Sequence, residues 1–507
     1  MPTTSTKQKR RRDTRAAVVT ALVLDPTSRA PLHRQVYEAL RDAILDGRMR
    51  PSSKLPSTRA LALHLNVARN TVMGAYEQLL SEGYLRGRLG SGTYVADALP
   101  EQLLLAKREP LPALPRPQRS ALLSKRGAMV ADAPSPFRRA WAPIGPGEMA
   151  FQVGMAAFDA FPADTWGRMI QRRWDRSWRD LLTLHEPQGY PPLRRAIADY
   201  LVTARGVRCT PEQVIVVSGT QQAISLAAQV LLDPGDSAWV EDPGYIVVKV
   251  ALEAAGAIAV PVPVDDEGLE VTIGVRRCKD ARVAVVTPSH QFPLGVTMSL
   301  RRRLALLAWA EEVNGWIFED DYDSEFRYAG QPLAALQGLS PDARVLYSGT
   351  FSKVLSSSLR LGYLVVPEGL VDAFVAAKAL ADVSSPPLEQ AALADFMDEG
   401  HFARHVRRMR VLYERRKDAL LTAGERELSG LLELQPATAG MHLVGWLPPG
   451  RDDREASARA AARGVRAYAL SELRIHAADR GALLLGYAGV TEEEIAEGAR
   501  RLAAALR

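Results

Sequence analysis

The sequence predicts a small helical domain followed by a large α/β domain whose central sheet is mostly parallel. Residues 27–97 alternate helical spacing of apolar residues with turn signals and end in a hairpin pattern. Residues 147–507 alternate short β-rich apolar runs with helical stretches, as in a parallel sheet covered on both faces. A proline-rich stretch separates the two regions.

The composition excludes several classes of protein. The chain has 507 residues, 47% of them hydrophobic, which is enough for several domains with cores of their own. Two distant cysteines, Cys209 and Cys278, exclude a disulfide scaffold and a Cys-rich zinc site. No apolar run approaches the roughly 20 residues that cross a bilayer, and the N-terminus lacks the apolar core of a signal peptide. We therefore expect a cytoplasmic protein with no membrane partner and no metal site.

The charge is distributed unevenly along the chain. The net charge is +6, but residues 1–100 carry +8, residues 98–146 carry +5 and residues 147–507 carry −7. A basic front on an acidic body predicts that only the N-terminal part meets a polyanion.

Two segments lack the patterns of folded elements. Residues 1–26 hold six basic residues between Lys7 and Arg15, which predicts a disordered basic arm, although a solvated tail without a partner fits equally well. Residues 98–146 contain nine prolines. Because proline breaks helices and sheet ladders, this segment is expected to be a partly extended linker.

Residues 27–97 are expected to form three helices and a hairpin. Apolar residues every fourth position, from Leu32 to Ile44, predict a helix that stops near Gly47. Ser57 is a candidate N-cap for a short second helix, and a third helix is expected over residues 69–80. Residues 84–86 and 93–95 should pair as a hairpin.

This order of elements is that of a winged helix-turn-helix DNA-binding domain. The start of the third helix would enter the major groove, while a glycine-rich wing approaches the backbone phosphates. The candidate contacts to double-stranded DNA are Arg59, Arg69, Asn70, Thr71, Arg88 and Gly90. A helical protein-interaction module is the alternative.

The motifs of this domain resemble those of GntR-family regulators. They are residues 55–62 (LPSTRALA), 67–72 (VARNTV) and 90–95 (GSGTYV). One departure is Ala68, where the family usually has a serine that would cap the third helix. We expect that helix start to be weaker by about 1 kcal/mol.

In the large domain, a lysine and an acidic cluster suggest vitamin B6 chemistry. Lys353 follows a strand, among small polar residues that include Thr350 and Ser352, where it could form a Schiff base with an aldehyde cofactor. Residues 319–322 (EDDY) follow the apolar strand 316–318. Pyridoxal phosphate (PLP) needs a carboxylate beside its ring nitrogen, for which Asp320 is the candidate, and Tyr322 could bind the ring hydroxyl. A solvated turn or a metal site is the alternative for this cluster.

Further residues could hold the rest of such a cofactor. Gly219, Thr220 and Gln221 lie between a strand and a helix, where free N–H groups would bind a phosphate. Arg360 offers a charged second phosphate ligand. Tyr245 follows another strand and could stack on the ring, or it could be an ordinary core tyrosine.

Taken together, the motifs resemble fold-type I aminotransferases and, more sharply, the MocR subfamily of GntR regulators. Residues 287–295 (TPSHQFPLG), 319–328 (EDDYDSEFRY) and 349–355 (GTFSKVL) carry this resemblance. It implies a winged helix-turn-helix fused to an α/β, fold-type I PLP-dependent aminotransferase-like domain. It also implies that Lys353 forms the Schiff base, Asp320 binds the pyridine nitrogen and Arg360 binds the phosphate.

Two departures from working aminotransferases concern substrate binding. Phe292 stands where many of them have an asparagine that contacts the cofactor, so His290 or Gln291 could substitute. Aminotransferases also hold the substrate carboxylate with an arginine near a C-terminal strand. The matching strand, residues 482–487, has none, which leaves Arg480 and Arg466 as candidates, and Val247 stands where GABA-responsive relatives have an arginine.

The sequence therefore predicts a PLP-responsive, homodimeric transcription regulator of vitamin B6 homeostasis or of amine or amino-acid metabolism. An amine or amino acid could be a second effector. The first alternative is a PLP-dependent aminotransferase with an accessory DNA-binding module. The second is a DNA-binding protein whose large domain is empty.

Overall fold

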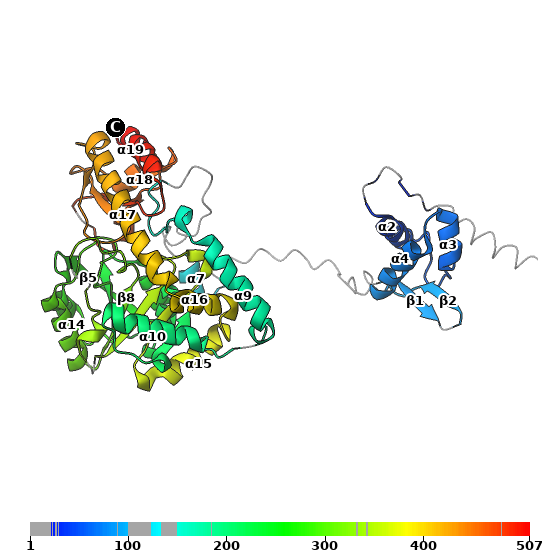
Figure 1. Ribbon diagram of the computed structural model, residues 1–507, viewed down its shortest axis with the longest axis horizontal. Coiled ribbons are helices and arrows are strands. Elements are labelled where there is room, and N and C mark those ends of the chain that lie inside the picture. The colour runs from blue at the N-terminus through cyan, green and yellow to red at the C-terminus, as the bar shows by residue number, and fades with distance from the viewer. Residues whose placement is uncertain are drawn as a thin grey trace, which may run out of the picture. The chain divides into compact units, whose positions relative to one another are not determined.

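The computed structural model describes residues 30–88, 90–99, 123–132 and 150–507 except 184, 331–332, 341–342 and 478, together with residues 22, 24, 25 and 28. The chain folds as two compact units, Met1–Pro117 and Gln118–Arg507 (Figure 1). No helix in these described ranges is long and apolar enough to cross a membrane.

The small unit contains the three helices and the hairpin that the sequence predicts. The elements are α2 (Leu32–Leu45), α3 (Thr58–Leu65), α4 (Arg69–Ser81), β1 (Leu85–Arg88) and β2 (Gly92–Val95). The apolar faces of the helices enclose a core that includes Val36, Leu40 and Val72. Leu22 is buried in the same core, so the folded unit includes part of the segment assigned to a basic arm. Residues 1–21 lie outside the described part.

The α-helices of the large unit pack on its central sheet or in its C-terminal part. Following the short helix α7 (Lys125–Ala131), they are α9 (Ala163–Leu181), α10 (Pro191–Arg205), α11 (Thr220–Leu231), α12 (Ile246–Ala255), α13 (Val271–Arg277), α14 (Leu300–Glu312), α15 (Val371–Asp382), α16 (Pro387–Asp398), α17 (His401–Glu427), α18 (Asp453–Ala461) and α19 (Glu492–Leu506).

The described residues of the large unit form an eight-stranded sheet in the order β3-β10-β9-β8-β7-β4-β5-β6. Neighbours from β9 to β5 pair in parallel, whereas β10 and β6 run against their neighbours. The strands are β3 (Val214–Val217), β4 (Ser237–Asp242), β5 (Ile258–Asp265), β6 (Gly268–Leu269), β7 (Val283–Val286), β8 (Trp316–Asp321), β9 (Val345–Thr350) and β10 (Gly362–Val365). Separate apolar clusters cover the sheet, which confirms the predicted α/β architecture.

Strand β8 is longer than the sequence predicts. The apolar run ends at Phe318, but Asp320 and Asp321 still pair with Ser348 and Gly349 of β9. The acidic residues are therefore the end of the strand and do not form a turn after it. Buried partners permit this, because Asp321 accepts hydrogen bonds from Arg205 Nε (2.8 Å) and from the Tyr347 hydroxyl.

A second, four-stranded sheet forms the C-terminal part of the large unit. Its order is β11-β12-β14-β13, from β11 (Glu433–Leu434), β12 (His442–Trp446), β13 (Tyr468–Ala469) and β14 (Ala482–Gly486). The long helix α17 packs against both α19 and α16, so it joins this part to the helices of the central sheet (Figure 1).

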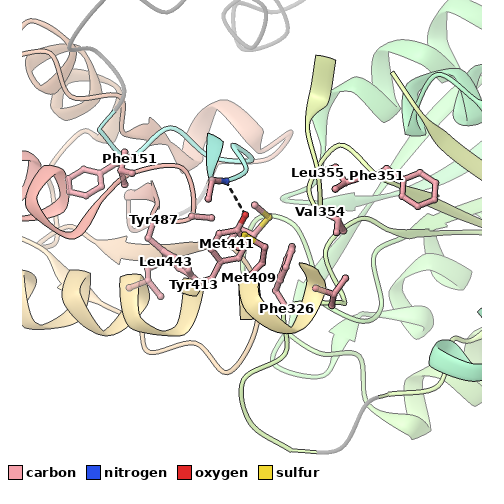
Figure 2. Packing of buried hydrophobic residues seen from close by; sticks show 14 of the residues in the cluster. Phe151, Phe326, Phe351, Val354, Leu355, Met409, Tyr413, Met441, Leu443 and Tyr487 are labelled. Carbon is pink, nitrogen blue, oxygen red and sulfur yellow. Dashed lines mark hydrogen bonds between the residues drawn. The ribbon is translucent and has the colours of Figure 1, made fainter. Parts of the chain in front are cut away.

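One apolar cluster connects the C-terminal part to the loop after β9 (Figure 2). Phe351, Val354 and Leu355 of that loop are buried in the same cluster as Tyr413 of α17 and Tyr487 after β14. The Tyr413 hydroxyl also accepts a 3.0 Å hydrogen bond from the N–H of Ala157. Residues 352–353 lie between these anchored side chains, so the packing fixes the loop that carries Lys353.

Helix α7 lies within the segment that the sequence assigns to a linker. Ser124 caps it by accepting a hydrogen bond from Gly127 N (3.0 Å). The helix packs on α12, where the Arg126 guanidinium approaches Gly256, the C-cap residue of α12. A cation beside the C-terminus of a helix is favourable. Residues 100–122 and 133–146 of the expected linker lie outside the described part.

Candidate functional site: a cofactor cavity and a DNA-binding surface

The large unit contains a cavity of about 280 Å³ beside the ends of β3, β8 and β9. The sequence-predicted cofactor residues all line it, although they come from five different segments of the chain. They are Gly219, Thr220, Gln221, Tyr245, Asp320, Tyr322, Thr350, Ser352, Lys353 and Arg360. Ligands bind at this position in open α/β sheets, outside the carboxyl ends of the strands.

Lys353 projects into the cavity from the loop after β9. Its Nζ donates a 3.0 Å hydrogen bond to the carbonyl oxygen of Gly154. Burial lowers the pKa of this amine, while Asp323 and Asp320 act in the opposite direction. A lowered pKa increases the neutral fraction, which is the form of the amine that attacks an aldehyde. The backbone φ of 79° at Gly154 favours glycine, and a Cβ on it would lie 2.6 Å from Lys353 Nζ, which would then have to shift.

Asp320 lies at the end of β8, on the floor of the cavity. Thr220 Oγ1 donates a hydrogen bond to its Oδ1 (3.1 Å). Burial is the main cause that raises the pKa of this carboxyl to about 7. Nearby carboxylates contribute to the increase, and Lys353 offsets only part of it. A cationic ring nitrogen placed here would stabilise the ionised form.

Tyr322 follows Asp320 and faces the same cavity. Its hydroxyl lies 3.0 Å from Nδ1 of His290, a buried histidine that also contacts Asp323 Oδ2 at 3.0 Å. Burial raises the pKa of Tyr322 well above its usual range, so its hydroxyl remains a hydrogen-bond donor.

The start of α11 forms an anion-binding corner of the cavity. Gly219 is its N-cap residue, with a φ of 131° that favours glycine. The guanidinium of Arg360 lies over Gly219, about 3.7 Å from where a Cβ would stand. Arg360 itself has a left-handed φ of 51°, and such strain at a non-glycine residue is common at ligand sites. Free N–H groups and a guanidinium together suit a phosphate.

Tyr245 and Phe292 form an aromatic side of the cavity. Tyr245 is the N-cap residue of α12, and its ring meets Phe292 edge-on at 6.0 Å. Phe292 itself lines the cavity. His290 and Gln291 are not among the described lining residues. The Gln291 side chain instead donates hydrogen bonds to Pro243 O (2.9 Å) and Glu241 (3.1 Å).

Sequence reasoning missed several further residues that line the cavity. They are Gln152, Val153, Gly154 and Met155 before α9, and Met441, His442, Tyr468, Ala469, Glu472, Leu473 and Leu484 in the C-terminal part. None of these residues belongs to a motif that indicates a phosphate site or a Schiff-base lysine. They can therefore be identified only from the tertiary packing. Arg480, considered as a carboxylate ligand, instead binds Glu433 (2.7 Å) and the carbonyl of Leu447 (2.9 Å). Neither Arg480 nor Arg466 is among the described lining residues.

In the small unit, the predicted DNA contacts lie on exposed positions. Arg59 of α3 and Arg69 and Asn70 at the start of α4 are exposed, and Thr71 is half-buried. Arg88 and Gly90 of the wing are also exposed, and the Arg88 guanidinium lies 5.0 Å from the Tyr94 ring centroid. One cation near the start of each of these two helices and one on the wing suit a polyanionic duplex.

The capping of α3 and α4 differs as the sequence predicts. Ser57 accepts a 3.2 Å hydrogen bond from Ala60 N and so caps α3. Ala68 at the start of α4 provides no side-chain cap. The first N–H groups of α4 are therefore available to an external acceptor.

The residues of the cavity fit PLP. The buried carboxyl of Asp320 lacks a full cationic partner, the Gly219–Arg360 corner suits a phosphate, and Lys353 carries an amine of lowered pKa. In the described residues there is no cluster of His, Cys, Asp and Glu that could hold a metal ion.

Comparison with known proteins identifies both units. Residues 32–95 match the model of bacterial regulatory proteins of the gntR family, and residues 159–502 match that of aminotransferase class I and II. The chain is 41% identical to the "Probable rhizopine catabolism regulatory protein MocR" of Rhizobium meliloti, covering 96% of both chains. The chain belongs to the MocR subfamily of GntR regulators.

Other relatives and solved structures agree with this assignment. This MocR-type regulator is 34% identical to the HTH-type transcriptional regulator TauR of Rhodobacter capsulatus, covering 97% of this chain and 100% of that one. Its large unit resembles the aminotransferase LysN of Thermus thermophilus, complexed with N-(5'-phosphopyridoxyl)-L-leucine, with 29% identity and a TM-score of 0.70. That match covers 77% of this chain and 98% of LysN. The protein is a transcriptional regulator with a DNA-binding domain and an aminotransferase-like domain.

Proposed function

We propose that this MocR-type regulator binds PLP in the cavity of its large unit and changes its binding to operator DNA in response. The observation that carries the proposal is the single cavity lined by all the predicted cofactor residues. When bound, PLP supplies an aldehyde that condenses with an amine and a ring that withdraws electrons. Lys353 would hold the aldehyde end, Asp320 the ring nitrogen and Tyr322 the ring hydroxyl.

The remaining contacts would come from other elements around the cavity. Gly219, Thr220 and Gln221 at the start of α11 would bind the phosphate together with Arg360, whereas Tyr245 would pack on the ring. Thr350 and Ser352 flank the lysine loop, where the Ser352 N–H donates to Thr350 Oγ1 (3.1 Å). Removing these polar groups and the ligand from water makes each interaction stronger than on an exposed surface.

Helix α12 provides a physical route from the cavity to α7, which lies in the expected linker segment near the start of the large unit. Its N-cap Tyr245 and its first residues Ile246 and Val247 line the cavity, while α7 packs on it and Arg126 approaches its C-cap. A ligand that orders Tyr245 therefore biases α12, on which the linker helix lies. This coupling would change how a homodimer places its two DNA-binding units on a pair of half-sites.

The target genes are inferred from the ligand chemistry. A regulator that senses PLP suits the control of vitamin B6 homeostasis or of amine and amino-acid metabolism. The name of one 32% identical relative, the pyridoxine biosynthesis regulator PdxR of Corynebacterium glutamicum, supports the first of these.

A DNA-shift titration of the full chain with and without PLP tests the proposal. We expect PLP to change the dissociation constant or the stoichiometry on the operator by at least threefold. Retained PLP binding with identical DNA binding in both conditions would overturn the sensor function.

Catalysis is the second candidate function, because Lys353 and Asp320 keep the arrangement that a PLP enzyme needs. Mixing the PLP-loaded protein with amino donors and keto acids distinguishes the two. Sustained turnover above about 1 s⁻¹, an ordinary enzyme rate, would favour an aminotransferase with an accessory DNA-binding module.

A further inference from the structure

A buried histidine contacts Tyr322, one of the residues that line the cavity. His290 is only 3% exposed, and its Nδ1 lies 3.0 Å from the Tyr322 hydroxyl. The same nitrogen lies 3.0 Å from Oδ2 and 3.2 Å from Oδ1 of Asp323, which is 1% exposed. The PLP contacts proposed above do not use His290, which is not among the described lining residues.

The surroundings of His290 determine which of its ring nitrogens carries the proton. An ionised carboxylate accepts hydrogen bonds and cannot donate one, so the Nδ1 that faces Asp323 has to be the protonated nitrogen. The other nitrogen, Nε2, is buried and has no hydrogen-bond partner in the described part of the chain. A buried N–H group without an acceptor is rare in folded proteins. Both observations therefore favour the tautomer with the proton on Nδ1.

Two glycines hold the His290 ring in its position. A Cβ on Gly440 would lie 2.5 Å from Nε2 and 2.8 Å from Nδ1, and a Cβ on Gly295 would lie 3.2 Å from Nε2. Both residues also have positive φ angles, 93° and 74°, which favour glycine. The close backbone leaves no room for another side chain beside the ring, so the ring keeps Nδ1 towards Asp323 and Tyr322.

The tautomer of His290 limits where Tyr322 can donate its own proton. Because Nδ1 carries a hydrogen, it donates towards the oxygens of Asp323 and Tyr322 and has no lone pair to accept the Tyr322 proton. No other hydrogen bond to the Tyr322 hydroxyl occurs among the described residues. Phe292 lines the cavity edge-on to this ring, at 6.1 Å, and offers no acceptor. The Tyr322 proton is therefore available to a ligand in the cavity.

The ionisable groups around Tyr322 and His290 favour the same arrangement. After burial, acids are the causes that raise the pKa of Tyr322, so it keeps its proton; they are Asp323, Asp320, Glu241 and Asp321. Burial and then His290 lower the pKa of His442, on β12, to about 4, so this neighbouring ring is uncharged at neutral pH. Burial also lowers the pKa of Lys353, which Asp323 partly offsets.

We propose that His290, held in one tautomer by Asp323, positions the Tyr322 hydroxyl so that it donates its proton to the ring hydroxyl oxygen of PLP. A buried aspartate fixes a histidine tautomer in the same way in Ser-His-Asp triads. His290 is a positioning residue, because it acts through Tyr322. Without its Nδ1–H group, the Asp323 carboxylate would compete with the ligand for the Tyr322 proton. The inference rests on the proposed function, since it assumes that PLP occupies the cavity.

The pH dependence of the absorbance of PLP on the full chain measures this hydrogen bond. The ring oxygen of PLP and the nitrogen of Lys353 would share one proton. A hydrogen bond from Tyr322 stabilises the oxygen without that proton, so the proton leaves at a lower pH. We define the hydroxyl contribution as the midpoint pH of the absorbance change with Tyr322→Phe minus the midpoint pH with Tyr322. In the otherwise unmodified chain it should be about one to two pH units, as for one charge-assisted hydrogen bond.

Variants of the histidine and of the aspartate locate the effect. His290→Leu and, separately, Asp323→Asn should reduce the hydroxyl contribution to less than about half of its unmodified value. His290→Asn should restore most of it, because the asparagine amide can donate from near the position of Nδ1. Each variant is compared with and without the Tyr322 hydroxyl, so its direct effects on charge and packing cancel.

His185→Leu is the matched control. This half-buried histidine of the large unit contacts the carbonyl oxygen of Asp180 (2.9 Å) and is not among the described lining residues, so the hydroxyl contribution should not change. An unchanged contribution in either His290→Leu or Asp323→Asn would overturn the proposal, as would a contribution near zero in the unmodified chain. If circular dichroism shows that His290→Leu does not fold, Asp323→Asn, which keeps the side-chain shape, decides the test.

The readouts separate this proposal from the proposed function. PLP binding and the PLP effect on DNA shifts are measured on the unmodified chain first. If the chain binds no PLP, both proposals are wrong. If PLP binds without changing DNA binding, the sensor function is wrong, and the hydroxyl contribution still tests the role of His290. If PLP binds and changes DNA binding while His290→Leu keeps the full hydroxyl contribution, only the role of His290 is wrong.

Discussion

Helices α4 and α11 both begin with backbone N–H groups that we expect to face phosphates. The two helix starts differ in their exposure to solvent. The start of α11 lies in a cavity, where Gly219 and the Arg360 guanidinium are held together. The start of α4 lies on an exposed surface, where Ala68 provides no cap. Because burial strengthens electrostatic interactions and solvent screens them, changes at the cavity should have steep effects and changes at the DNA surface graded, salt-dependent ones.

The largest effect in the cavity is expected from Lys353→Ala. The variant has no amine at the loop after β9, so borohydride reduction should trap no PLP on the protein, whereas the unmodified chain should gain one PLP mass. Peptide mass spectrometry reads out the result directly. Covalent PLP on another lysine of the variant would show that Lys353 is not the attachment site. Circular dichroism should show that the fold is retained.

The next largest effect is expected from Asp320→Asn. It removes the buried charge proposed to pair with the PLP ring nitrogen. Breaking a buried ion pair costs about 3–5 kcal/mol, so PLP affinity should fall about 100- to 4,000-fold. Equilibrium dialysis measures it. Asp372→Asn in the first turn of α15 serves as a control for the substitution itself. A loss below fivefold would mean that Asp320 does not face the ring nitrogen.

The Asp320 carboxyl group should also make the stability of the PLP-free protein depend on pH. Its pKa is raised from 3.8 to about 7, chiefly by burial. The folded state therefore holds this proton between pH 4 and 7 while the unfolded chain releases it, so this group makes the free energy of unfolding fall as pH rises through that window. Asp320→Asn should flatten the slope by up to about 1.4 kcal/mol per pH unit. Urea unfolding at several pH values measures it, and equal slopes would contradict it.

At the exposed surface, Arg69→Ala should have a smaller effect. If Arg69 reads a base, the specific operator should lose about 1–3 kcal/mol of binding while other sequences lose little. If Arg69 contacts a phosphate, all DNA sequences should lose affinity equally. The slope of log affinity against log salt concentration should then become shallower by about one. Arg34→Ala, which removes an exposed arginine of α2 paired with Glu38, is the control. No change on any DNA would exclude both roles.

The sequence predicted a set of residues that line one cavity because these residues sit at strand ends and helix starts. Gly219, Asp320 and Lys353 follow apolar runs, and the carboxyl ends of parallel strands converge on one edge of a sheet. The exact end of β8 was missed, since the apolar pattern stops at Phe318 while ladder pairing continues through the buried acids. Hydrophobic periodicity does not report a buried strand made of carboxylates.

The remaining residues that line the cavity could not be predicted from local pattern. Val153 lies more than three hundred residues before Tyr468 and Leu484, which belong to short strands without a motif. Only tertiary packing brings these residues to one cavity. Helix α7 was missed for a different reason. The many prolines around it predict an extended linker, and its stability comes from packing on α12, which lies more than a hundred residues later.

The smallest expected effect is that of Ala68→Ser, which would make the start of α4 more like a capped helix. The backbone at Ala68 (φ −63°, ψ 145°) closely matches that at Ser57 (φ −65°, ψ 153°), whose side chain accepts from Ala60 N. A serine here should therefore accept from the N–H of Asn70 or Thr71 and stabilise α4 by about 1 kcal/mol. Hydrogen exchange should slow about fivefold at these amides. Ala60→Ser, inside α3, is the control and should slow nothing. Unchanged exchange in Ala68→Ser would mean that α4 does not fray at its start. The contrast between α4 and α11 would then rest on their solvent exposure alone.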